Sequence, residues 1–204
     1  MLASGYLVGP KANLNGAVLN GDDLSNASLN GADLSNTSLH DVNFTGANLT
    51  GANLTNASAT GGNFTGANLS KALVYGLFDG ANLTNANLAG TYFNPLTLAS
   101  LSSGGIIGAP ASMATGWSLV HGYLVGPQAN LIGANLNGAN LAGVVFAGAN
   151  LTNADITNAD LSGANLSTSI LAGVHATGVT YSALTTCPNG HHFGDPAANC
   201  PSAS

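Results

Sequence analysis

Charged side chains are scarce in this chain of 204 residues, and arginine and glutamate are absent. Charged residues make up 5 % of the sequence, against about 25 % in an ordinary soluble domain. The two basic residues, Lys11 and Lys71, cannot form a positive patch for phosphate backbones, so we expect no direct nucleic-acid binding. The net charge of −6 favours solubility more than it defines a partner.

Long apolar runs are also missing. No uninterrupted stretch of about 18 apolar residues occurs, so we expect no membrane span. The segment Met1-Leu2-Ala3-Ser4-Gly5 has neither a basic start nor a long apolar core, so we predict no signal peptide. A disordered chain is not expected, because 45 % of the residues are hydrophobic and leucine recurs strictly.

A five-residue period dominates the sequence. A large apolar residue, here called the centre, recurs at every fifth position, and a small residue, usually Ala, stands two positions before it. This period matches neither an α-helix nor a plain strand. Residues two apart share one face of an extended segment, so the small residue and the centre point inward together. The Asn, Ser, Thr and Gly between them face outward or turn the chain, and a narrow core results.

The centres form two arrays. The first array contains Leu14, Leu19, Leu24, Leu29, Leu34, Leu39, Phe44, Leu49, Leu54, Ala59, Phe64, Leu69 and Val74, and then, after one missing residue near Gly76, Phe78, Leu83, Leu88 and Phe93. The second array contains Leu131, Leu136, Leu141, Phe146, Leu151, Ile156, Leu161, Leu166, Leu171, Ala176 and Tyr181. Such long arrays predict a repeat fold.

The pattern A(N/D)LxG resembles the pentapeptide-repeat family over residues 12–93 and 129–181. The resemblance implies an all-β fold, a right-handed quadrilateral β-helix (β-solenoid) with four pentapeptides, or about 20 residues, per coil. Neighbouring coils would then lie about 4.8 Å apart.

Coils of this size would stack centres about 20 positions apart. One expected column holds Leu24, Phe44 and Phe64, and another holds Leu19, Leu39, Ala59 and, after the slip, Phe78. Ala59 is the only small centre of the first array, so we expect Phe78 to fill the space beside it.

Asp22 occupies an inward position, two residues before the centre Leu24. A buried carboxylate needs hydrogen-bond partners or a proton. Two hypotheses remain open: a solvated carboxylate at a frayed end, or a protonated or hydrogen-bonded structural one.

The period stops over residues 94–128, which contain the only tryptophan, Trp117. This segment is apolar and aromatic, unlike a flexible linker, so we expect an ordered element that covers an end or a side of a solenoid. We therefore divide the chain into a lead-in (1–11), a first solenoid (12–93), an ordered insertion or cap (94–128), a second solenoid (129–186) and a tail (187–204).

The sequence GYLVGP introduces each array, at Gly5 and, 117 residues later, at Gly122. The first copy lacks the segment that precedes the second one. We expect either that the chain is cut from a longer tandem protein or that another chain completes its open first coil. A bare strand edge invites pairing, and head-to-tail contacts that do not close give filaments.

The tail carries both cysteines, Cys187 and Cys200, around a loop rich in Pro, Gly and Asn. We predict a disulfide between them, which favours a secreted or cell-surface protein. The alternatives are reduced thiols and a metal site that adds His191 or His192, although the spacing is unlike that of common zinc sites. A cytoplasmic location stays open, since no signal peptide is predicted.

No catalytic pattern stands out, because His40, His121 and His175 are scattered and no paired carboxylates occur at a suitable spacing. We therefore predict no enzyme, no cofactor and no metal, but a structural or protein-interaction scaffold, self-assembling head to tail.

The family resemblance implies one alternative, a DNA-mimic binder of DNA gyrase as in quinolone-resistance proteins, but the acidic residues form no stripe. A further alternative is ice or carbohydrate binding by a flat face, with Ser25, Thr45 and Thr65 in one surface column.

Overall fold

The computed structural model describes residues 2–201, which fall into two compact units with the boundary between Thr115 and Gly116. No described residue is helical, so no helix in this range has the length and apolarity to cross a membrane. Regular strands are short: β1 (Leu2–Ala3), β2 (Tyr6–Leu7), β3 (Leu73–Val74), β4 (Tyr92–Phe93), β5 (Ser112–Met113), β6 (Ser118–Val120) and β7 (Tyr123–Val125). Most backbone pairing occurs instead at isolated bridges, one in each pentapeptide.

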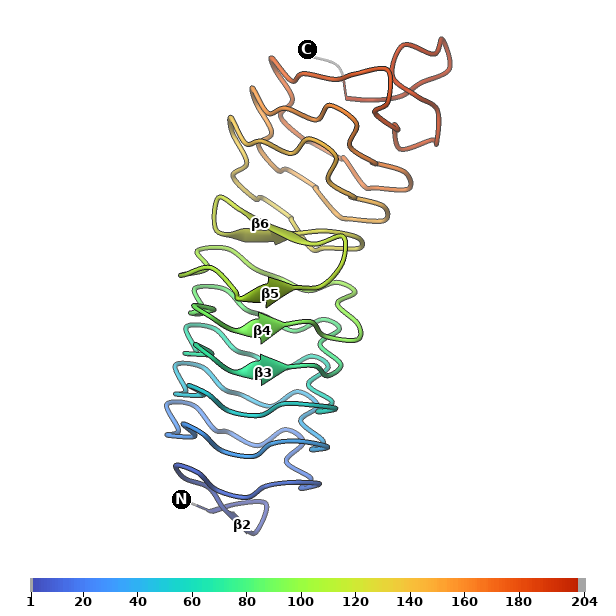
Figure 1. Ribbon diagram of the computed structural model, residues 1–204. Helices are drawn as coiled ribbons and strands as arrows, with labels where there is room; N and C mark the ends of the chain where they lie inside the picture. The colour runs from blue at the N-terminus through green and yellow to red at the C-terminus, as the bar shows by residue number, and fades with distance from the viewer. Residues whose placement is uncertain (1, 202–204) are drawn as a thin grey trace. The chain divides into compact units, whose positions relative to one another are not determined.

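Parallel bridges between residues 20 positions apart build the first unit, as Asn13 pairs with Asp33, Asp33 with Asn53 and Asn53 with Leu73. The N–H of each centre donates to a carbonyl of the following turn, such as Leu24 to Asn43 at 2.8 Å. Figure 1 shows the resulting turns of the first unit, coloured blue to green, stacked one on another. The chain is therefore a β-helix in which backbone hydrogen bonds join each turn to the next.

The repeat pattern fills the inside of both units. Every centre of the first array is at most 2 % exposed, and the alanines two positions earlier are buried with them, apart from the half-buried Ala12 of the first coil. In the second unit the centres from Leu131 to Leu166 are equally buried. Alternation along short extended segments explains this, because residues two apart face the same side.

The polar positions of the repeat form the tight turns that join the extended segments within each coil. Where Asn or Asp stands before a centre, its side-chain oxygen accepts a hydrogen bond from the N–H two residues later, as from Thr45 to Asn43 at 3.1 Å and from Thr152 to Asn150 at 3.0 Å. Two residues after nearly every centre the backbone takes positive φ, for example 66° at Gly46 and 55° at Asn26. Gly and Asn suit this conformation better than other residues, which explains why they recur there.

The slip in the repeat lies at Gly76. The bridges that span it have an offset of 19, as Ser58 pairs with Leu77, and the offset returns to 20 in the next turn, where Leu77 pairs with Thr97. A Cβ on Gly76 would stand 3.0 Å and 3.1 Å from the backbone C and N of Ala57. Only glycine fits such a close approach of two turns, so this residue lets the chain omit one position without breaking the pairing.

Phenylalanine rings form a continuous stack inside the first unit. The ring centroids of Phe44 and Phe64 are 5.1 Å apart, and those of Phe64 and Phe78 are 5.4 Å apart. Ala59 lies in register with Phe78, because the N–H of Ala59 donates to the carbonyl of Leu77. The Phe78 ring therefore extends beyond its own column to contact Phe64.

Replacing Ala59 with leucine should lower the free energy of unfolding by about 1–3 kcal/mol, because three methyl-sized groups would be forced into a filled core. Ala59 is fully buried beside the phenylalanine stack. Chemical denaturation of the variant measures the change. Unaltered or raised stability would mean that the site beside Phe78 contains unused space.

Backbone pairing continues past Phe93, although the five-residue pattern stops there. Leu77 pairs with Thr97, Asn82 with Ser102, and β4 with β5. The inward positions of this turn hold Leu98, Leu101 and Ile106, each at most 9 % exposed. Backbone hydrogen bonds do not require a particular side chain, so the turn persists where the sequence pattern is lost.

The second unit begins with a hairpin of β6 and β7 and then repeats the same pairing, as Asn130 pairs with Asn150 and Asn150 with Ile170. Its last turn is followed by the tail, which returns antiparallel, with Thr186 paired to His192. The two units therefore share one construction, a hairpin followed by stacked pentapeptide turns.

Candidate protein-binding edge of the first solenoid

A hairpin of β1 and β2 covers the start of the first unit. Leu2 pairs with Leu7 and Ala3 with Tyr6, around a turn with positive φ at Ser4 and Gly5. Ala3 is buried against the first coil, whereas Leu2 and Leu7 are 70 % and 75 % exposed. The hairpin thus has an inner face that closes the core and an outer face that presents two leucines.

The first coil (residues 12–31) has an unpaired backbone edge. Within residues 2–201, the N–H and C=O groups of four residues make no hydrogen bond: Asn13, Val18, Asp23 and Ser28. One turn later the equivalent N–H groups are all used, as Ser38 donates to Ala17 at 2.9 Å. The edge is open because the preceding residues fold into the hairpin instead of running beside the coil. Such an edge can accept another strand.

Asp22 joins the hairpin to the first coil. The Ser4 hydroxyl donates to Oδ1 of Asp22 at 2.8 Å. The other oxygen, Oδ2, is buried and has no hydrogen-bond partner among the described residues. This carboxylate therefore lies under the turn of the hairpin and contacts it directly.

The acidic side chains of the repeat are engaged in turns. Asp33 accepts hydrogen bonds from the hydroxyl and the backbone N–H of Ser35, and these bonds hold its pKa below the usual value. The backbone N–H of Ser25 lowers the pKa of Asp23 in the same way. In the second unit, hydrogen bonds from Thr157 lower the pKa of Asp155. These carboxylates stay ionised, but they act as turn caps spread over several faces.

Hydroxyls stand in one surface column, in register through the parallel bridges that join Asp23, Asn43, Asn63 and Asn82. The column contains Ser25, Thr45, Thr65 and Thr84. Each threonine hydroxyl donates to the asparagine two residues before it at 2.7 Å. Thr84 is absent from the sequence-based column, because the slip at Gly76 must be counted to find it.

The tail covers part of the last coil of the second unit. Cys187 and Cys200 form a disulfide, so neither sulfur is available as a thiolate ligand. Phe193 stacks on Tyr181 with centroids 4.7 Å apart, and burial raises the pKa of Tyr181 to about 12. His191 pairs with Asp195 at 3.0 Å, and no group of three potential metal ligands occurs among residues 2–201.

These features define a β-helix repeat protein with short polar turns and a core of stacked leucine and phenylalanine. The model of the pentapeptide repeats matches eight copies, over residues 11–41, 37–73 and 129–167. The chain belongs to the pentapeptide-repeat family.

Several solved structures of pentapeptide repeat proteins are similar to this chain. HetL from the cyanobacterium Nostoc sp. strain PCC 7120, involved in heterocyst differentiation regulation, is 28 % identical, with a TM-score of 0.34 over 90 % of this chain and 88 % of HetL. Rfr23 from the cyanobacterium Cyanothece 51142 is 22 % identical, with a TM-score of 0.26 over 86 % and 87 %. Full-length QnrB1, a plasmid-mediated fluoroquinolone resistance protein, is 18 % identical, with a TM-score of 0.26 over 84 % and 92 %. No curated protein matches the chain.

Proposed function

We propose that this chain is a non-enzymatic scaffold that binds protein, including further copies of itself, at the open edge of its first coil. The observation that carries the proposal is the row of unpaired backbone groups at Asn13, Val18, Asp23 and Ser28, beside a hairpin with exposed leucines. Unpaired strand edges next to apolar surface are typical protein-binding elements.

The proposal includes a right-handed, four-sided coil of about 20 residues, in line with the bridge offset of 20. With this geometry, the first coil lacks the partners that a preceding turn would supply. The last coil has the complementary groups unused, since the N–H groups of Leu171 and Ala176 donate to no group among residues 2–201. One copy can therefore follow another head to tail, and such a contact does not close on itself.

The outer face of the hairpin supports the same contact. The GYLVGP hairpin of the second unit pairs in the same register, with Leu119 opposite Leu124 as Leu2 is opposite Leu7. Leu124 is fully buried, whereas its counterpart Leu7 is 75 % exposed. The same hairpin motif thus has this leucine covered in the second unit and exposed in the first, and burial of a leucine side chain contributes about 1.5–3 kcal/mol.

The alternatives from the sequence receive less support. A gyrase-binding DNA mimic needs acidic columns, whereas Asp23, Asp33 and Asp155 act as turn caps on separate turns. A flat ice- or carbohydrate-binding face needs free hydroxyl donors, whereas those of Thr45 and Thr65 are used within the chain. We therefore favour the scaffold.

Light scattering across a concentration series tests the proposal. The wild-type mass should rise from 20.0 kDa to at least its double, and electron microscopy should show rods. Changing Leu7 to lysine should keep the protein monomeric, because a charge then replaces the exposed leucine at the contact. The matched control is Leu96→Lys, since Leu96 is 68 % exposed and lies on a later turn, where its N–H donates to the carbonyl of Gly76.

A wild-type mass that stays at 20.0 kDa at all concentrations would contradict self-association. An equal rise in the mass of the Leu7→Lys variant with concentration would show that the hairpin face is not the contact. A Leu96→Lys control whose mass also stays at the monomer value would mean that added charge prevents association wherever it is placed.

A further inference from the structure

The tail folds back along one backbone edge at the end of the second unit and runs antiparallel to it. The N–H of Cys187 donates to the carbonyl of His191 at 2.7 Å. The N–H of Phe193 donates to the carbonyl of Thr185 at 2.8 Å. The tail therefore occupies two backbone groups of this edge, the N–H of Cys187 and the carbonyl of Thr185.

One turn earlier, the equivalent two groups are bonded by the turn that follows. The N–H of Leu166 donates to the carbonyl of Thr186 at 2.8 Å, and the N–H of Thr186 donates to the carbonyl of Ala164 at 2.9 Å. In both units, the residue before a centre uses its N–H and C=O in this way to join the turn to the preceding one. His192, which is paired with Thr186, thus stands where such a residue of a further turn would stand.

The disulfide holds the tail in this place. Cys187 is fully buried, and Cys200, which is bonded to it, packs against the hydrophobic core of the unit. Residues 189–197 of the loop between the two cysteines are all exposed. Apart from the covalent bond, a few hydrogen bonds and the stacking of Phe193 on Tyr181 attach the loop to the coil. A segment with so few buried contacts opens locally at low free-energy cost once its covalent link is cut.

We propose that the bond between Cys187 and Cys200 is a redox latch on the last coil. In the disulfide form the tail blocks this edge, and in the dithiol form it leaves the edge free to pair with the first coil of a second copy. The inference rests on the proposed function, because it concerns the regulation of the head-to-tail contact. Exchange of the tail for another strand at the same backbone groups needs no rearrangement of the coil itself.

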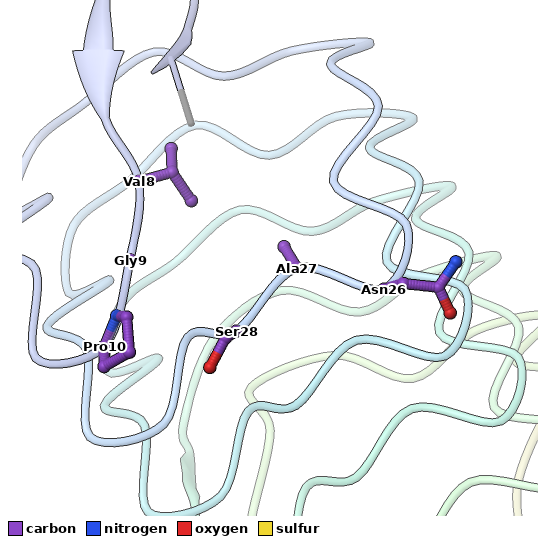
Figure 2. A pocket seen from close by; sticks show the side chains of 6 residues that line it. All are labelled: Val8, Gly9, Pro10, Asn26, Ala27 and Ser28. Atoms are coloured by element: carbon purple, nitrogen blue, oxygen red, sulfur yellow. The ribbon is translucent and has the colours of Figure 1, made fainter.

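The first coil carries the complementary groups. Each of its four unpaired residues stands before a centre, as Thr186 does, and has both its N–H and its C=O unused within residues 2–201. Figure 2 shows one of them, Ser28, at the pocket beside the lead-in, with its side chain pointing away from those of Val8 and Ala27. The N–H of such a residue can donate to the carbonyl that the tail now uses, and its C=O can accept the N–H of Cys187.

A dithiol reductant opens the latch by thiol–disulfide exchange. Its thiolate attacks Sγ of Cys200, which is half-buried, and displaces the fully buried Cys187 as a thiolate that takes up a proton. The second thiol of the reductant then attacks the mixed disulfide, which frees Cys200 as a thiol and leaves the reductant as a disulfide. Two electrons pass from the reductant to the protein, and the two protons of the dithiol end on the two cysteines.

Hydrogen exchange of single amides, measured by NMR on the full chain, tests whether the tail opens. On reduction, the N–H groups of Cys187 and Phe193 should lose protection at least about tenfold, because their acceptors belong to the contact between tail and edge. The N–H groups of Leu166 and Thr186, which join the last turns to each other, should keep their protection. A disulfide that only staples the coil would loosen both pairs together.

Light scattering of the same samples tests the consequence for association. The concentration at which half of the protein is associated should fall at least about tenfold on reduction and return on reoxidation. The Cys187→Ser, Cys200→Ser double variant should associate like the reduced wild type, with or without reductant. The matched control is Phe193→Ala, which loses the ring stack but keeps the disulfide, so its oxidised form should associate like the oxidised wild type.

Unchanged protection of Phe193 after reduction, or loss of protection at Leu166 as well, would overturn the latch. Equal association of the oxidised and reduced protein would also overturn it, but would leave the proposed head-to-tail scaffold standing. A mass of 20.0 kDa in both redox states, with the tail open in the reduced one, would overturn head-to-tail association itself and with it the regulatory role of the bond.

Discussion

Replacing Phe64 with alanine should lower the free energy of unfolding of the first unit by about 3–5 kcal/mol. Phe64 is fully buried, and its ring contacts Phe44 on one side and Phe78 on the other, at 5.1 Å and 5.4 Å. Loss of the ring removes both aromatic contacts and leaves a cavity that the paired backbone cannot close. Urea denaturation followed by circular dichroism measures the change.

The control for this prediction is Leu96→Ala. Leu96 is 68 % exposed, so its truncation should alter stability by no more than about 0.5 kcal/mol. A loss of less than about 1 kcal/mol in Phe64→Ala would mean that the turns shift to refill the cavity, and that the phenylalanine stack does not govern stability.

The sequence was most informative where side chains repeat. Counting 20 residues along the chain places Phe64 above Phe44. In the structure the centroids of these two rings are 5.1 Å apart. The same count assigns Phe78 to the column of Ala59. It does not predict that the Phe78 ring also contacts Phe64 of the neighbouring column. Counting positions assigns a residue to a column, but it does not say how far a large side chain extends from it.

Features that depend on backbone geometry could not be predicted from the side-chain pattern. The turn formed by residues 97–113 keeps its bridges without the pentapeptide pattern, because hydrogen bonding between turns needs no particular side chain. The contact between Trp117 and Gly126 could not be predicted from the sequence either. The repeated GYLVGP shows that two lead-ins are alike, but the contact of the ring with Gly126 depends on a hairpin that brings residues nine positions apart together.

Removing the disulfide between Cys187 and Cys200 should destabilise the second unit by about 3 kcal/mol in the chain-entropy model, since the two residues are 13 positions apart. The bond holds the returning tail, in which the N–H of Cys187 donates to the carbonyl of His191 and Phe193 stacks on Tyr181. Without it, the tail should separate more readily from the last coil and expose the ring of Tyr181.

Trp117 is the only tryptophan in the sequence and packs against the core of the second unit, so its fluorescence during denaturation follows the unfolding of that unit. The Cys187→Ser, Cys200→Ser double variant and the reduced wild type should unfold at the same lower denaturant concentration. A reducing agent should have no effect on the double variant, which is the control. An unchanged midpoint after reduction would mean that the pairing of Thr186 with His192 and the Tyr181–Phe193 stack hold the tail in place without the covalent bond.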